Sequence, residues 1–191
     1  MNYSPIFISA CIVQPLRFLF KNYAPEHLRW DEDPMKSQIE IDTINNFHKV
    51  AIQTKPRILI SRGGYSKSST GLTDNLAASP GPYVSHGLHE EVKMILVNGM
   101  AQVLIQSKQE GTCEVLCEMV EHFIQWTSPM LCDTYGFKSF AFPLQVSPCT
   151  PNREDTEIFE ISLAAPWVRE EHWNISNDAI KLKEFTLTLT D

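Results

Sequence analysis

This 191-residue chain has no cluster of lysine or arginine and no common catalytic or phosphate-binding motif. Its 16 basic residues are scattered among 23 acidic ones, which gives a formal net charge of −7. Because nucleic-acid binding depends on clustered cations that neutralise phosphates, we do not expect a DNA-binding face. A P-loop, an H-E-x-x-H helix and a nucleophile elbow are all missing. The sequence therefore favours a protein that acts by contact, without catalysis and without a cofactor.

Long hydrophobic runs are absent as well. The apolar segment 6–13 is too short to span a membrane. No positive charge precedes it, although a secretory signal requires one. The ending Ile8-Ser9-Ala10-Cys11 matches a lipoprotein cleavage site only loosely. We expect a soluble intracellular protein that has no contact with a membrane.

Cysteine is sparse and is not arranged as a metal or disulfide framework. The chain has 5 cysteines, an odd number, with no C-x-x-C pair. This usage indicates reduced thiols in a cytoplasmic setting. Cys113 and Cys117 are four residues apart, so on a helix they share a face, where core packing is the simpler interpretation.

A metal site is the main alternative from a different class of function. His86 and His89 are followed by Glu90 and Glu91, and these residues could serve a small metal-binding enzyme. The spacing is not that of a zincin helix. A third hypothesis is a monomeric module whose long loop closes over a small molecule.

Glycine is scarce, and it is concentrated in one segment. Five of the 8 glycines fall between Gly63 and Gly87. Just before them, the run Ile58-Leu59-Ile60 is typical of a buried strand. We therefore predict a strand over 50–61 and a long irregular loop over 63–89. So long a connection in a compact domain usually binds something.

Apolar spacing predicts two helices. Ser4 and Pro5 mark the start of the first helix, within an N-terminal helix or arm over 1–24. This helix either covers one face of the sheet or docks on a neighbouring subunit. The second helix is predicted over 112–126, with Thr112 as N-cap and Ser128-Pro129 closing or kinking it. Its expected core stripe consists of Cys113, Leu116, Cys117, Val120, Phe123 and Ile124.

Alternating apolar residues predict the strands. We expect them over 37–42, 50–61, 91–106, 139–146, 159–167 and 185–189. Asn98-Gly99 marks either a tight hairpin turn or a glycine bulge in one long strand, and the sequence does not separate these alternatives. Pro143 requires its strand to be an edge or bulged at that point. The prediction is one α+β domain over 1–191, with a mixed, largely antiparallel sheet and one major helix packed on it.

The order of several segments resembles a family of tailed-bacteriophage neck proteins, which includes tail terminators and the stopper-like rings between portal and tail. The resemblance covers the chain from about residue 20 onward, to a long strand that ends near Trp167. It is carried by Leu28-Arg29-Trp30-Asp31, the segment Lys36–Ile41, the segment Lys55–Gly64, Leu96–Val103 before the main helix, and the helix Cys113–Ile124.

The resemblance implies a homo-oligomeric ring in the virion neck, assembled in the host cytoplasm. Such a ring is a hexamer in most cases and a dodecamer in the alternative. It contacts other neck, portal-side and tail-tube proteins, and DNA passes through its channel without sequence-specific binding. One central helix on a mixed sheet suits a tail terminator better than the small β-barrel of many stoppers. A stopper or adaptor ring is the runner-up.

Five residues are predicted to make contacts between subunits or with partners. Arg57, Arg62 and Lys67 lie in or beside the glycine-rich segment. Trp30 and Trp167 join them because tryptophan is enriched at interface hot spots. Core burial is an equally good interpretation of both tryptophans, and a solvated strand end is an equally good one for Arg62.

Overall fold

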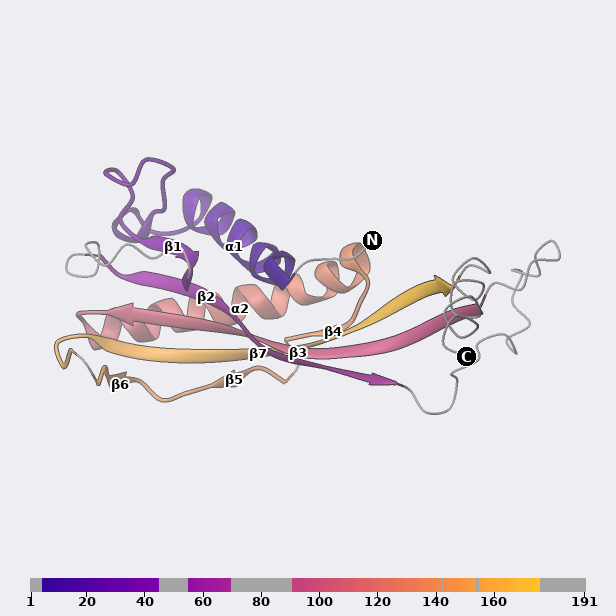
Figure 1. Ribbon diagram of the computed structural model, residues 1–191. Coiled ribbons are helices and arrows are strands. Elements are labelled where there is room, and N and C mark those ends of the chain that lie inside the picture. Colours follow the sequence, from indigo (N-terminus) through magenta and orange to yellow (C-terminus); the bar gives the residue numbers. More distant parts are fainter. Residues whose placement is uncertain (1–4, 45–54, 70–90, 142, 154, 176–191) are drawn as a thin grey trace, which may run out of the picture. The chain divides into compact units, whose positions relative to one another are not determined.

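The computed structural model describes residues 5–44, 55–69, 91–141, 143–153 and 155–175 (Figure 1). The predicted α+β class is confirmed: two helices lie on a mixed, mostly antiparallel sheet of seven strands. The elements in chain order are α1 (Pro5–Asn22), the 3-10 turn η1 (Glu26–Leu28), β1 (Glu40–Thr43), β2 (Arg57–Ser69), β3 (Glu91–Ser107), α2 (Glu110–Tyr135), β4 (Phe137–Phe140), β5 (Gln145–Val146), β6 (Thr150–Pro151) and β7 (Phe159–Ile175).

The chain divides into two compact units. The first unit joins Met1–Tyr65 to Gly99–Val168 and contains both helices. The second unit joins Ser66–Asn98 to Arg169–Asp191. The candidate surfaces and the polar network described below lie in the first unit, and the second unit holds Lys67 among the predicted contact residues.

The sheet has the strand order β1-β2-β3-β7-β4. β1 is parallel to β2, with Glu40 opposite Arg57. Along the outer side of β7, β5 and β6 pair antiparallel, with Gln145 opposite Ala164 and Thr150 opposite Glu160. The strands β4, β5 and β6 therefore form one interrupted border along β7.

The interruption corrects the prediction of a single strand over 139–146. β4 ends at Phe140 and β5 begins at Gln145. Ala141 between them has a left-handed backbone, with φ of 55°. Pro143 cannot donate a backbone hydrogen bond, so the ladder breaks there, at the edge of the sheet. Short strands and prolines are devices that protect a sheet edge from unwanted pairing.

The glycine-rich segment was only partly predicted. β2 continues through Gly63 and Gly64 to Ser69, so the prediction of a loop is wrong for residues 63–69. The physical reason is close packing of neighbouring strands: a Cβ on Gly63 would lie 2.9 Å from the Met100 carbonyl oxygen. The rest of the predicted loop, 70–89, lies outside the described residues, as do residues 50–54 of the predicted strand over 50–61 and the predicted strand over 185–189.

Of the two alternatives for Asn98-Gly99, the single long strand is correct, because β3 runs without a turn from Glu91 to Ser107. Gly99 is required by its neighbour on β7. A Cβ on Gly99 would lie only 2.3 Å from Cζ2 of Trp167. The glycine thus makes room for an indole ring rather than for a turn.

The helices lie over one face of the sheet, with α1 against β1 and α2 against β4, and they also touch each other (Figure 1). In α1, Pro5 is the first helical residue, and Ile8, Ile12 and Leu16 are buried, whereas Leu19 on the same face is half-buried. The Arg17 Nε atom donates to the Ile41 carbonyl oxygen at 3.0 Å, which ties α1 to β1.

α2 is longer than predicted at both ends. Its N-cap is Gln109 rather than Thr112, and it continues through Pro129 to Gly136, whose φ of 69° ends it. The Ser128 hydroxyl donates to the Phe140 carbonyl oxygen at 2.5 Å, and Leu131 is buried. This packing stabilises the last turns in spite of the proline. The six predicted stripe residues of α2 are all buried, as expected.

Candidate functional site

The five predicted contact residues do not form one surface. Arg57 and Trp167 are buried, with 5% and 6% of their surface exposed. Trp30 is half-buried, whereas Arg62 and Lys67 are exposed on β2. The three half-buried or exposed residues keep their predicted role as a hypothesis. The two buried ones are packed inside the subunit, as the alternative interpretation of Trp167 expected.

Arg57 begins a chain of polar side chains that crosses the sheet. Its Nε atom donates to the Gln106 Oε1 atom at 2.7 Å. Gln106 Nε2 in turn donates to Glu160 Oε2 at 3.0 Å, and Asn152 Nδ2 donates to the same oxygen at 2.6 Å. Burial lowers the pKa of Arg57, and the charge of nearby Glu40 opposes that shift. Since an arginine side chain stays protonated in proteins, the network holds a buried cation against β3 and β7.

A small cavity lies at one end of this network. Its volume is about 10 Å³, and its lining consists of Lys55, Arg57, Gln106, Ser107, Lys108 and Ile158. That volume is about the minimum for a single water molecule, so no organic substrate fits it. The ammonium group of Lys55 donates to the carbonyl oxygens of Pro34 and Ser37 at 2.8 and 2.6 Å. Through these two hydrogen bonds, Lys55 connects the segment 30–37 to the start of β2.

Trp167 fills the space above Gly99 on the helix-covered face. Its ring meets Phe137 edge-on, with ring centroids 6.2 Å apart. Its indole Nε1 atom is buried and has no hydrogen-bond partner among the residues that the structure describes. The ring is a core element of the first unit.

Trp30 and Arg62 each take part in a cation–π contact. The Arg17 guanidinium lies 5.2 Å from the Trp30 ring centre, and the same arginine pairs with Asp42 at 3.5 Å. The Arg62 guanidinium lies 5.4 Å from the ring centre of Tyr65, which is half exposed. Exposed cation–π pairs contribute about 0.5–1 kcal/mol, so Arg62 is held only weakly and is available to a partner.

Cys11, Cys113 and Cys117 are buried, whereas Cys132 and Cys149 are partly exposed. The Cys113 thiol donates to the carbonyl oxygens of Ile105 and Phe159 at 3.6 and 3.7 Å. Burial raises the pKa of Cys113 to about 12 and that of Cys117 to about 11. These thiols stay protonated at neutral pH, whereas a nucleophile or metal ligand needs the thiolate. No group of three His, Cys, Asp or Glu residues is placed to hold a metal in the described parts of the chain, and His86 and His89 lie outside them.

The surface that the sequence analysis missed is the outward side of α2. Beside its buried face the helix carries a second apolar row, formed by Val115, Met119, Trp126 and Met130, with His122 among them. Trp126 is 79% exposed, Met130 52% and Val115 49%. We call this row the apolar stripe. A long exposed row of large apolar side chains is unusual on a monomer and indicates an interaction site.

An acidic row runs parallel to the apolar stripe, one residue earlier along the helix. It consists of Glu110, Glu114, Glu118 and Glu121, and Gln125 continues it. The Gln125 side chain donates to the Glu121 carboxylate at 3.1 Å. α2 contains no lysine and no arginine, and Asp133 adds a fifth acidic residue. The outward side of α2 is therefore both apolar and strongly negative.

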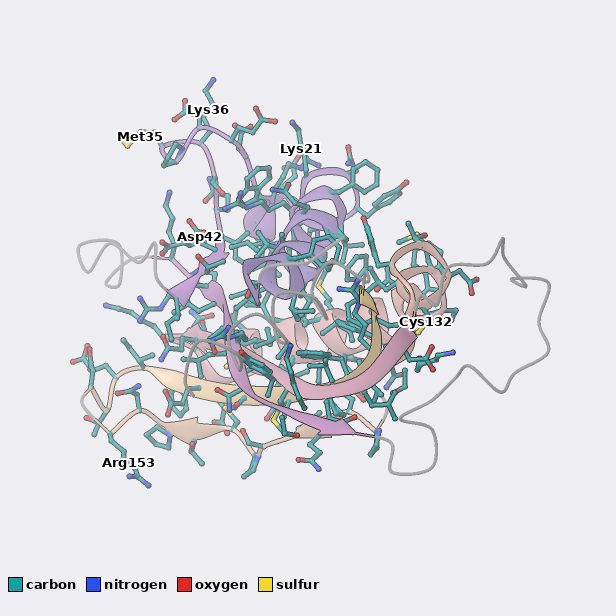
Figure 2. The ribbon with its side chains drawn as sticks, turned by 45° about the vertical axis from the view of Figure 1, so that its right-hand side comes forward. Lys21, Met35, Lys36, Asp42, Cys132 and Arg153 are labelled. Carbon is teal, nitrogen blue, oxygen red and sulfur yellow. The ribbon has the colours of Figure 1, made fainter. Side chains whose placement is uncertain are left out.

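A different exposed apolar surface lies at the C-terminal end of α1. Phe18 and Tyr23 are 62% and 73% exposed, and their rings meet edge-on with centroids 6.2 Å apart. Nearby, Lys21 and Met35 point outward from α1 and from the segment that follows it (Figure 2). Lys21 pairs with Glu32 at 2.8 Å, so the charge around these aromatic rings is largely neutralised. We call the pair Phe18 and Tyr23 the aromatic corner.

The sequence did contain a signal for the apolar stripe. Positions 115, 119, 126 and 130 repeat with helical spacing, but the predicted helix ended at 126, which left Met130 out of the pattern. No family model and no curated protein sequence matches this chain. Neither helix in the described residues is long and apolar enough to cross a membrane.

Proposed function

We propose that this chain is a structural subunit of a ring in the neck of a tailed-phage virion, of the tail-terminator type. The ring is a hexamer, with a dodecamer as the alternative. The proposal rests on the segment resemblance and on the α+β architecture, in which one long helix packs on a mixed sheet. That architecture suits a terminator better than a small β-barrel stopper.

The observation that carries the proposal is the presence of two separate exposed apolar surfaces on one small subunit. The aromatic corner belongs to α1, and the apolar stripe belongs to α2. In a ring, a subunit uses one surface to meet its neighbours, and we assign the aromatic corner to that role. A neck subunit also needs surfaces for the proteins above and below it.

The charge of the chain is compatible with DNA passage. Each subunit carries a formal net charge of −7, so a ring of several subunits is strongly negative as a whole. Like charges repel, and DNA therefore moves through without being retained. The proposal assigns no catalytic group and no cofactor. It places the protein in the virion after assembly in the host cytoplasm.

The first test is the oligomeric state of the purified protein, measured by native mass spectrometry and by negative-stain imaging. We expect closed rings with a central hole. The double substitution Phe18→Ser and Tyr23→Ser should release monomers, because it removes the aromatic corner without touching the core. Val146→Ser is the matched control, since Val146 is an exposed apolar residue on β5.

A closed two-fold dimer would contradict the proposal. If the protein is a monomer in isolation, the test moves to purified phage particles that carry the gene. Mass spectrometry should then find the chain in the particle, in a ratio of a few copies to one virion. Its absence from complete particles would also contradict the proposal.

A further inference from the structure

We infer that the outward side of α2 binds a basic amphipathic helix of another protein. The inference deepens the proposed function, since a neighbouring neck protein would supply that helix. The surface itself is defined by α2 alone. It consists of the apolar stripe and the acidic row, which run side by side from Glu114 to Glu121, about two turns of the helix.

The spacing and length of the apolar stripe suit a partner helix. Val115, Met119, Trp126 and Met130 recur every three or four residues if His122 is counted with them, and this spacing is that of a helix seam. From Val115 to Met130 the stripe is about 22 Å long, at 1.5 Å per residue. A partner helix of similar length would place its own apolar row along the stripe, as in other helix-in-groove contacts.

The charge of the surface favours a basic partner. The acidic row lies along only one side of the stripe, and α2 itself carries five carboxylates and no lysine or arginine. Among the described residues, salt bridges form in α1 and the segment after it rather than in α2. A partner with lysine or arginine along one flank would pair with this row, and the attraction would also speed association.

A second copy of α2 is an unfavourable occupant of this surface. Two α2 helices packed on each other would bring ten carboxylates together, twice the five of one helix. The chain as a whole is also acidic, at −7. Like-charge contact of this kind is unfavourable, which favours a basic partner helix over a second α2.

Trp126 lies in the C-terminal half of the stripe and is the most exposed of the three tryptophans whose placement the structure describes. A tryptophan that is exposed in the free protein and becomes buried on binding often contributes a large part of the binding free energy of an interface. The indole ring of Trp126 packs little against the rest of the subunit, so its exposed position does not stabilise the isolated chain.

The test uses a fluorescein-labelled synthetic helix with leucine on one face and lysine on the other. A matched peptide has glutamate in place of lysine. We expect fluorescence anisotropy to show binding of the lysine peptide, with an affinity that falls as salt rises, and no binding of the glutamate peptide. Trp126→Ser should weaken binding at least about tenfold, as expected for a hot spot.

Reversal of the acidic row provides the second variant. Glu114→Lys with Glu118→Lys should weaken binding of the lysine peptide and permit binding of the glutamate peptide. The double substitution Phe18→Ser and Tyr23→Ser is the matched control, because it removes exposed aromatic surface elsewhere and should leave peptide binding unchanged. Circular dichroism of each variant confirms that the fold is intact.

Three results would overturn the inference. They are unchanged binding in Trp126→Ser, equal loss in the α1 control, and equal binding of the two peptides. If Trp126→Ser instead dissociates the oligomeric ring into monomers, α2 contacts another copy of the chain. The inference of a basic partner then fails, and the ring proposal stands. If no ring forms but the lysine peptide binds α2 as described, the ring proposal fails and the inference stands.

Discussion

Trp167 and Trp126 show how differently the same residue type is used in the first unit. Trp167 is 6% exposed and lies directly above Gly99, whereas Trp126 is 79% exposed on the outward side of α2. The sequence analysis chose Trp167 as an interface residue and did not choose Trp126. A tryptophan therefore indicates a binding surface only when the surrounding structure leaves it exposed.

The largest expected effect comes from removal of the buried tryptophan. Trp167→Ala should lower the free energy of unfolding by about 3–5 kcal/mol, because it leaves a cavity above Gly99. Urea unfolding followed by circular dichroism measures the change. A loss below about 1 kcal/mol would show that the Trp167 indole contributes little to the core, and the contrast with the exposed Trp126 would then not hold.

The opposite change at the same contact should also destabilise the fold. Gly99→Ala places a methyl group where the indole ring already lies, 2.3 Å from Trp167 Cζ2. We expect a loss of about 1–3 kcal/mol from overpacking. Combined with Trp167→Ala the substitution should cost much less than alone, and a double-mutant cycle of unfolding free energies measures that coupling. Additive losses would contradict the contact.

The buried polar network gives the next effect. Gln106→Leu removes the acceptor for the Arg57 Nε atom and the donor to Glu160. We expect a loss of about 1–3 kcal/mol, since buried polar groups then lose partners. Gln102→Leu is the control, because Gln102 is an exposed residue of the same strand. Equal effects of the two substitutions in urea unfolding would argue against a role for the network.

The buried thiols predict a pH dependence. Burial raises the pKa of Cys113 from 9.0 to about 12, so the unfolded chain releases this proton at lower pH than the folded one. The contribution to stability is complete below pH 9 and is lost as the pH rises toward 12. Unfolding measured from pH 8 to pH 11 should show a decline that is shallower in Cys113→Ala. An equal decline in both proteins would contradict this origin.

The smallest effect on stability is expected at the exposed tryptophan. Trp126→Ser should change the free energy of unfolding by less than about 0.5 kcal/mol, as is usual for surface positions. Its consequence should appear in association, measured by the peptide binding described above. A large loss of stability would mean that Trp126 packs inside the fold and would reverse the comparison with Trp167.

Much of the fold could be predicted from local pattern. The buried stripe of α2 and the alternation of Ile161, Leu163 and Ala165 on β7 are both visible in the sequence, since burial on one side repeats with the period of the element. The ends of elements were less predictable. Pro129 was expected to end or kink α2, but packing of Leu131 and the Ser128–Phe140 hydrogen bond stabilise the turns beyond it.

The candidate site was predicted less well than the fold. Arg57 was predicted to contact a subunit or partner, yet its side chain is buried and bonds to Gln106, 49 positions later in the chain. Arg62 and Lys67 are exposed as the prediction needs. The apolar stripe was missed because the predicted helix ended at 126, which left Met130 out of the pattern.

The sequence by itself determined the α+β class, the core faces of both helices and the acidic character of α2, because periodicity and charge are local properties of the chain. Only the tertiary structure decided that Gly63 and Gly99 serve close packing rather than turns, and which tryptophan is buried. Those outcomes depend on residues that are distant in the sequence and adjacent in space. Local pattern carries no information about such neighbours.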